Sequence, residues 1–211
     1  MGAAQHAALF EHRVRRQDLN RFGFGNTFEL KIFTMDTNAY AHFDSGSVEH
    51  SLLFGVDYST SESKIVSGFS FAAPLDVFAP VYGSRVPDLF IYGNVNQPID
   101  QLGIYVQDQM KFASRWIATL ALRQDSTDIT TDNRLSDSQV DQSDSALTGR
   151  VALTYLAESG LAPYFSYSTS FLPVAGVDFY NRPFDPTEGE QFEAGLKFQP
   201  KGSNSFLTAS L

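Results

Sequence analysis

The residues that most often carry catalysis or bind metals are few in this sequence and poorly spaced for either task. The four histidines are His6, His12, His42 and His50. The last two flank a turn and differ in parity relative to the apolar face, so they do not form a metal-binding pair. The sequence contains no cysteine, which excludes disulfides and thiolate metal sites. We therefore expect no metal site.

Carboxylates gather in a polar stretch at 126–145, where they recur every three to five residues. An EF-hand loop places its ligands at positions 1, 3 and 5, so we interpret this stretch as a solvated loop. The serine-rich run at 166–170 lacks the elbow glycines and the paired base of a nucleophile, and we expect no enzyme. The carboxylates of the polar stretch at 126–145 are Asp128, Asp132, Asp137, Asp141 and Asp144.

Composition narrows the class of protein further. The formal net charge of -9 leaves no basic stripe to neutralise phosphates, which argues against a nucleic-acid partner. Nineteen Phe and nine Tyr among 211 residues favour strands over helices. The sequence therefore predicts an all-β fold.

Alternating hydrophobicity predicts where the strands of this all-β fold lie. Apolar and polar side chains alternate with a period of two, which is the period of a strand. The expected strands lie at 27–44, 48–58, 102–112, 116–125, 146–157, 161–171, 189–199 and 204–211, and residues 1–26 are expected to be an irregular segment. A parity change near Met35 suggests a bulge in the first strand.

Short and long connections take turns along the chain. The expected short turns are 45–47, 113–115, 158–160 and 200–203, and the expected long loops are 60–99, 126–145 and 172–188. In an up-and-down antiparallel sheet this places all long loops at one end. Bacterial outer-membrane barrels have this asymmetry, with short periplasmic turns and long extracellular loops.

The two faces of the expected sheet differ in chemistry. The apolar face carries aromatics near strand ends, namely Phe43, Phe54, Tyr58, Phe112, Trp116, Tyr155, Phe165 and Phe198, with Asp108 as one violation of the pattern. The opposite face is polar and includes Glu49, Asp57, Gln107, Gln109, Thr119, Arg123, Thr148, Arg150, Thr154, Ser166, Ser168, Glu193 and Lys197. Opposed charges on one face suit a water-filled lumen better than the dry core of a soluble sandwich.

Three segments of the sequence, in this order, resemble the barrel of TonB-dependent siderophore receptors, notably the ferrichrome type. They run from Gln101 to Gln109, from Gly160 to Phe171 and from Gly189 to Lys197. The likeness extends over roughly Asp36 to Leu211. It implies a barrel of 22 strands in the bacterial outer membrane, plugged by an N-terminal domain, that imports ferric siderophores with energy relayed through TonB.

The resemblance also indicates how much of such a receptor the sequence holds. Set against the family pattern, we expect the sequence to lack the plug domain, the TonB-contacting segment and a signal peptide, and to hold about eight strands instead of 22. We therefore expect residues 27–211 to be a middle-to-late piece of the barrel. The implied partners are a ferric siderophore, the TonB complex through the missing plug, and outer-membrane lipid.

By the same resemblance, a siderophore would contact aromatic side chains of the extracellular loops, and the iron would arrive already saturated by its chelator. No protein cofactor is expected. The candidate ligand-binding residues are Phe78, Tyr82, Phe90, Tyr92, Phe179, Tyr180 and Phe184. Two alternatives remain open from the residues: a complete eight-stranded outer-membrane barrel with a structural or adhesive role, and a soluble β-protein that binds a ligand.

Overall fold

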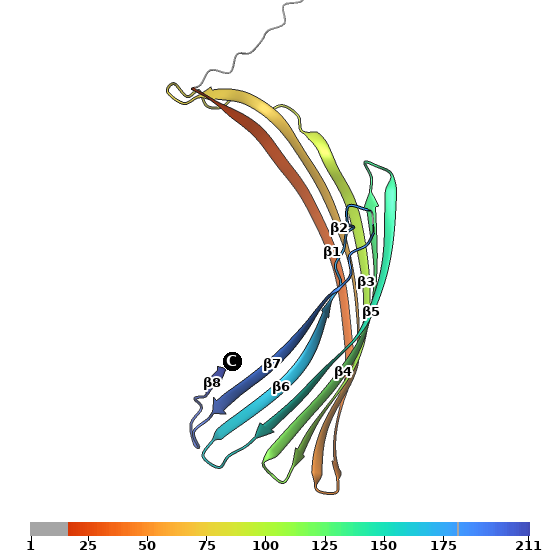
Figure 1. Cartoon of the computed structure of the whole chain (residues 1–211), viewed down its shortest axis with the longest axis vertical. Coiled ribbons are helices and arrows are strands. Elements are labelled where there is room, and N and C mark those ends of the chain that lie inside the picture. The colour runs from red at the N-terminus through yellow and green to blue at the C-terminus, as the bar shows by residue number, and fades with distance from the viewer. Residues whose placement is uncertain (1–16, 181) are drawn as a thin grey trace, which may run out of the picture. The chain divides into compact units, whose positions relative to one another are not determined.

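The computed structural model describes residues 17–180 and 182–211, which contain eight strands (Figure 1). Each strand pairs with its neighbours in sequence, in the order β1 to β8, and the pairs from β3 to β8 are antiparallel. The predicted all-β, up-and-down sheet is confirmed. The strands are β1 (Asp18–Ser45), β2 (Val48–Asp76), β3 (Phe90–Phe112), β4 (Trp116–Asn133), β5 (Ser138–Tyr155), β6 (Leu161–Leu172), β7 (Thr187–Phe198) and β8 (Leu207–Ser210).

The chain divides into two compact units. In its described part, unit 1 comprises residues 17–28 and 65–94, and unit 2 comprises 29–64, 95–180 and 182–211. No helix in the described part of the chain is long and apolar enough to cross a membrane. The sites of the two units are therefore considered separately below.

Three of the four expected short turns lie close to their predicted positions, whereas the connection expected at 200–203 spans 199–206. Strands β1 and β2 meet at residues 46–47, β3 and β4 at 113–115, and β5 and β6 at 156–160. Gly46 and Gly160 have φ angles of 65° and 88°, which a residue without a Cβ adopts at no steric cost. The long loop between β6 and β7 is also present, at 173–186.

Two other loops and the first segment were predicted wrongly. The expected loop at 60–99 is mostly strand, because β2 continues to Asp76 and β3 begins at Phe90. The expected loop at 126–145 is a long hairpin whose turn spans only 134–137. Residues 17–26 are not irregular, because β1 begins at Asp18, whereas residues 1–16 lie outside the described part. In the β4–β5 hairpin, polar side chains without a continuous apolar face hid the strands, which need only hydrogen-bonded neighbours to persist.

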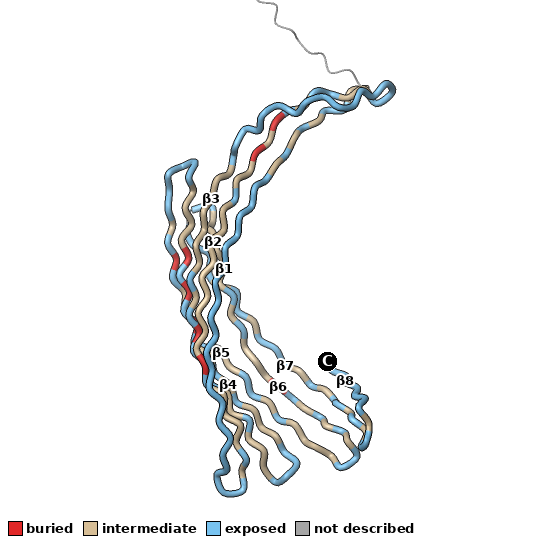
Figure 2. The backbone as a smooth tube through the Cα atoms, turned by 180° about the vertical axis from the view of Figure 1, so that it is seen from behind, coloured by how far each residue is buried: buried red, intermediate tan, exposed pale blue. Residues whose placement is uncertain are grey.

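The register places the predicted faces together. Phe112 pairs with Trp116, Trp116 with Tyr155, and Leu153 with Phe165, so the apolar side chains of β3 to β6 share one face. The polar face carries Tyr105 beside Arg123 and Arg123 beside Thr148. Ile129 is the only buried hydrophobic residue in the described part, and Figure 2 shows exposed and intermediate residues along nearly all of the strands.

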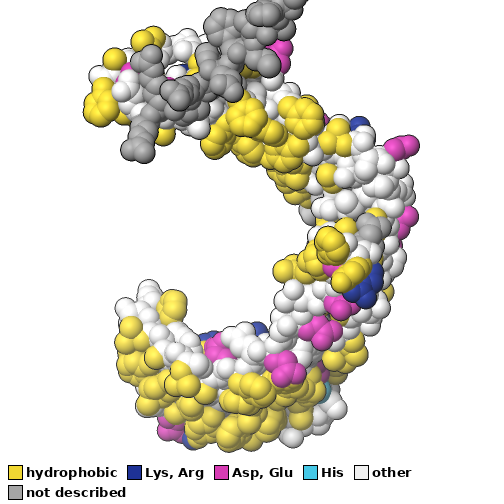
Figure 3. Space-filling model, turned by 45° about the horizontal axis from the view of Figure 1, so that its top comes forward, with side chains coloured by type: hydrophobic (Ala, Val, Ile, Leu, Met, Phe, Trp, Pro, Cys, Tyr) yellow, Lys and Arg dark blue, Asp and Glu magenta, His cyan; other side chains and the backbone are white. Residues whose placement is uncertain are grey.

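Within residues 17–180 and 182–211, nothing packs over the apolar face of unit 2. Leu120, Leu122, Val151 and Phe165 are about half exposed. In Figure 3, hydrophobic side chains form a broad band in the lower part of the view, with acidic side chains above it. Such a large exposed apolar surface marks contact with a membrane or another protein.

The violation at Asp108 is explained by a partner from β2. His50 Nδ1 lies 2.7 Å from Asp108 Oδ2, and the two side chains are 15% and 23% exposed. The Phe43 ring stacks on the imidazole with centroids 4.7 Å apart. A carboxylate on the apolar face is thus paired and covered, which lowers the cost of placing it among apolar side chains.

Candidate functional site

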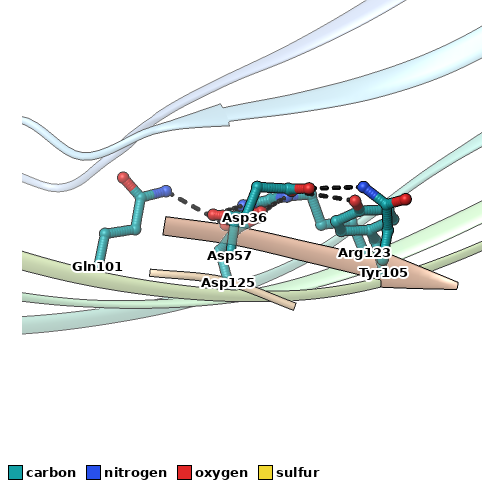
Figure 4. Close-up of polar contacts among 7 residues, drawn as sticks. Asp36, Asp57, Gln101, Tyr105, Arg123 and Asp125 are labelled. Carbon is teal, nitrogen blue, oxygen red and sulfur yellow. Dashed lines mark hydrogen bonds and ion pairs between the residues drawn. The ribbon is translucent and has the colours of Figure 1, made fainter. Parts of the chain in front are cut away.

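The polar face of unit 2 carries a network of charges centred on Arg123 (Figure 4). The guanidinium donates to both oxygens of Asp57 on β2, with Nη2 3.1 Å from Oδ1. It also grips Asp125 on its own strand, with Nε–Oδ2 at 2.8 Å and Nη2–Oδ1 at 2.6 Å. Arg123 and Asp125 share a face because they are two residues apart on a strand. Because one cation faces two carboxylates, the three side chains together keep a net negative charge.

Further side chains extend this network across β1 to β4. Gln101 donates to Asp125 at 3.1 Å, and the Tyr105 hydroxyl donates to Asp36 at 3.0 Å. The guanidinium of Arg123 lies 5.8 Å from the centre of the Tyr105 ring, within cation–π range. Sequence analysis placed Asp57 and Arg123 on this face but missed Asp36. The Arg-x-Asp spacing on a strand was the signal available for Asp125.

Two glycines make room for the network. A Cβ at Gly55 would collide with the Tyr105 ring, and a Cβ at Gly103 would collide with the Arg123 guanidinium. Both glycines stand on strands whose neighbours send a large side chain across them. Their role is close approach, because neither is among the residues with positive φ.

Unit 1 carries an aromatic cluster around Phe69. Its ring centroid lies 5.7 Å from that of Phe71 and 6.0 Å from those of Phe90 and Tyr92. Phe24 lies 6.1 Å from Tyr92. Phe22, Phe24, Phe69 and Tyr92 line a shallow apolar depression of about 350 Å³. Aromatic rings left exposed in this way can cover an organic ligand.

The candidates of the first long loop divide between loop and strand. Phe90 and Tyr92, expected in the loop, lie on β3 and join the Phe69 cluster. Phe78 and Tyr82 lie in the loop at 77–89 and are 85% and 75% exposed. Two of the candidates thus belong to the cluster, whereas Phe69 at its centre was not among the candidates.

The candidates of the other long loop surround a tight turn between β6 and β7. The rings of Phe179 and Tyr180 meet edge-on at 5.4 Å and are 95% and 73% exposed. The Arg182 guanidinium lies 5.2 Å from the centre of the Tyr180 ring. Phe184 is held at the base, where its carbonyl accepts a hydrogen bond of 3.0 Å from Gln142 on β5.

Asp178 holds this turn. One of its oxygens accepts the backbone N–H groups of Tyr180 at 2.8 Å and Arg182 at 2.9 Å, and the other accepts the Arg182 side chain at 3.1 Å. These bonds to the charged form, above all the backbone N–H of Arg182, lower the pKa of Asp178 below its ordinary value. The exposed rings of Phe179 and Tyr180 are therefore next to a carboxylate that binds the backbone on both sides of the turn.

The described residues offer no set of metal ligands. No group of three or more His, Asp or Glu side chains within 17–180 and 182–211 is arranged to hold a metal ion. The aspartates of the β4–β5 hairpin bond to neighbouring side chains instead: Thr130 donates to Asp141 at 2.7 Å and Ser143 to Asp128 at 2.6 Å. Bonds from Thr130 and Gln139 lower the pKa of Asp141.

Comparison with known proteins adds the family context of these features. Residues 3–211 match the model of the family described as TonB dependent receptor-like, beta-barrel. The chain is 34% identical over 193 residues to the ferrioxamine B receptor of Salmonella typhimurium, covering 92% of the chain and 27% of that protein. It is 30% identical over 202 residues to the ferrichrome outer membrane transporter/phage receptor of Escherichia coli K12, covering 87% and 25%.

Solved structures share the fold. The siderophore receptor PiuA of Acinetobacter baumannii superposes with a TM-score of 0.75 at 20% identity, over 88% of this chain and 31% of that chain. The ferric-catecholate import receptor Fiu of E. coli K12, in its closed form, gives 0.72 at 19% identity over the same shares. The chain thus spans about a quarter of the length of its curated relatives and under a third of these structures.

Proposed function

Because this chain belongs to the TonB-dependent receptor β-barrel family, we propose that it is part of an outer-membrane receptor that binds and imports ferric siderophores. The observation that carries the proposal is the sheet itself. Its strands follow one another in sequence order, with one face apolar and uncovered and the other polar and charged. This is the wall of a transmembrane barrel, with lipid on one side and a wet lumen on the other.

Family membership also gives the cellular location of the protein and argues against the soluble β-protein that the sequence left open. The family consists of outer-membrane receptors, so the expected localisation is confirmed. It is not a family of enzymes. In such a receptor the apolar face contacts lipid. In a soluble β-protein the same face would be buried in the interior. The match to receptors about four times longer favours a barrel segment over a complete eight-stranded barrel.

The proposed mechanism is binding followed by passage, without chemistry at the iron. The ferric chelate is substrate, and its organic surface stacks on exposed rings at the end of the barrel that carries the long loops. Each unit is a separate candidate for this contact: unit 2 offers Phe179 and Tyr180, held by Asp178, and unit 1 offers the Phe69 cluster. Energy for release into the periplasm is supplied through TonB, and the barrel is seated in lipid by its apolar face.

Iron uptake by cells tests the proposal. Cells that lack the full-length receptor gene are complemented with it and supplied with radiolabelled iron as a ferric trihydroxamate. The proposal predicts TonB-dependent accumulation of iron that is lost in the deletion strain. Equal uptake with and without the gene, across trihydroxamate, triscatecholate and citrate chelates, would overturn it.

A further inference from the structure

The charges of unit 2 are distributed unevenly along the strands. We divide unit 2 at the level of Arg123 and its contacts. The distal half, toward the β4–β5 turn and the β6–β7 loop, comprises residues 29–36, 57–64, 95–105, 123–148, 170–180 and 182–189. The turn half, toward the short turns, comprises residues 37–56, 106–122, 149–169 and 190–211.

The distal half is strongly acidic and the turn half is nearly neutral. The distal half holds fourteen carboxylates against five basic side chains, whereas the turn half holds six against five. The same number of basic side chains on each side shows that the difference comes from added aspartates and glutamates. The half that carries the exposed Phe179 and Tyr180 is therefore the acidic half.

The polar face of the distal half has little capacity to hold an anion. Its carboxylates are Asp36, Asp57, Asp125 and Asp144, and by strand alternation its one basic side chain among the described strand residues is Arg123. That guanidinium is engaged by two carboxylates at once. An anionic ligand would have to compete for this guanidinium with both carboxylates, of which Asp125 is only 6% exposed.

The other basic side chains of this half are also engaged. Lys31 lies 3.1 Å from Glu29, Lys64 lies 3.4 Å from Glu62, and Arg182 lies 2.9 Å from Asp178. Arg134, at the hairpin turn, lies 3.4 Å from Asp132. Each cation of the distal half thus has a carboxylate beside it, and the unneutralised charge is negative.

This distribution bears on a question that the family does not answer. Solved receptors of the same fold include importers of ferric catecholates and of ferric citrate, so family membership leaves the charge of the chelate open. A ferric trihydroxamate is neutral at the metal and becomes cationic when it carries a free amine. A ferric triscatecholate is strongly anionic. Clefts lined by one sign of charge raise the local concentration of ligands of the opposite sign.

We propose that the distal half selects ferric siderophores by charge, favouring cationic or neutral chelates and repelling polyanionic ones. This inference rests on the proposed function and adds the class of chelate to it. Asp36, Asp57, Asp125 and Asp144 set the sign on the polar face. The exposed aromatic rings supply contact area that is indifferent to charge, so the acidic wall provides the discrimination.

The test uses the full-length receptor in outer-membrane vesicles and ligands that differ in charge alone. The probes are a ferric trihydroxamate with a free primary amine, its N-acetyl derivative and its N-succinyl derivative, with a ferric triscatecholate as the polyanion. At low salt we expect the aminated chelate to associate about tenfold faster than the succinylated one. The ratio should fall toward one at high ionic strength, because exposed charges are then screened.

A charge-removal variant and a matched control locate the effect. The double variant Asp36→Asn with Asp144→Asn removes two charges from the polar face of the distal half. We expect the ratio of the association rates of the aminated and succinylated chelates to fall at least threefold. Asp44→Asn with Glu158→Gln removes two charges from the turn half and should leave the ratio unchanged. Folding of each variant is checked by heat-modifiable migration on electrophoresis.

The outcomes separate the two proposals. Binding of all three trihydroxamates with equal, salt-independent rates would overturn charge selection while leaving siderophore import standing. Preference for the triscatecholate would also overturn it. Failure of every chelate to bind a folded receptor would overturn the proposed function itself, and the inference with it.

Discussion

The two halves of unit 2 use polar side chains in different ways. In the turn half, charges stand in isolated pairs, such as Lys111 with Glu49 and Arg115 with Glu158. In the distal half, Arg123 joins Asp57 and Asp125 in a network that continues to β1 through Tyr105. The difference is that the turn half balances its charges in separate pairs, whereas the distal half gathers more carboxylates around one guanidinium than that cation can neutralise.

The largest effect should come from charging the apolar face. Leu120 and Ala121 are neighbours on β4 that point to opposite faces. We expect Leu120→Arg to destabilise the barrel by about 2–4 kcal/mol, because the cation enters hydrocarbon. Ala121→Arg, on the polar face, should cost under about 1 kcal/mol. Urea denaturation in vesicles measures both, and equal losses would show that the faces are misassigned.

Removing the centre of the network should be nearly as costly. Arg123→Met leaves Asp57 and Asp125 facing each other without a cation, and we expect a loss of about 2 kcal/mol, reduced from the fully buried case by partial exposure. Arg150→Met, on the same face in the turn half, serves as the control and should lose less than half as much. A larger loss for Arg150 would reverse the contrast between the halves.

Replacing His50 alone should destabilise the protein more than replacing His50 and Asp108 together. His50→Leu leaves the Asp108 carboxylate without its partner among apolar side chains. We expect it to lower the free energy of unfolding by about 2 kcal/mol. Combining His50→Leu with Asp108→Leu removes both polar groups and should restore at least the stability of the parent. A double variant less stable than the parent would mean that the pair stabilises the sheet in its own right.

The smallest expected effect is on the β6–β7 loop at low pH. The pKa of Asp178 is lowered in the folded loop, so its contribution is complete above the ordinary Asp pKa of 3.8 and is lost as pH falls through the lower folded value. A fluorophore attached to Ala175→Cys should report loosening in that range. Asp178→Asn should remove the pH response, and a response that survives this change would assign it to another group.

Sequence alone was enough for the parts of the fold that alternate hydrophobicity. Strands such as Leu161–Leu172 and the turn at Gly46 were predicted because apolar residues recur with period two and glycine permits positive φ. The aromatic candidates at Phe179 and Tyr180 were also found in a loop, as the family resemblance implied. Their role in ligand binding stays a prediction.

The extended ends of β2 to β5 could not be read in the same way. Residues 126–133 and 138–145 have no apolar face, so alternating hydrophobicity gave no signal there and they were mistaken for a loop. Their pairing is fixed by backbone hydrogen bonds and by side-chain bonds such as Thr130 to Asp141, which depend on register. The network around Arg123 was missed as a unit for the same reason, since it joins residues on four strands.

Labelling of single cysteines from outside the cell tests the central claim most directly. This chain contains no cysteine, so Ser136→Cys in the β4–β5 turn and Ser159→Cys in the β5–β6 turn can be compared on intact cells with a membrane-impermeant maleimide. We predict that position 136 is labelled and that position 159 is labelled only after the outer membrane is opened. Equal labelling of both on intact cells would contradict a transmembrane wall with its acidic half outside.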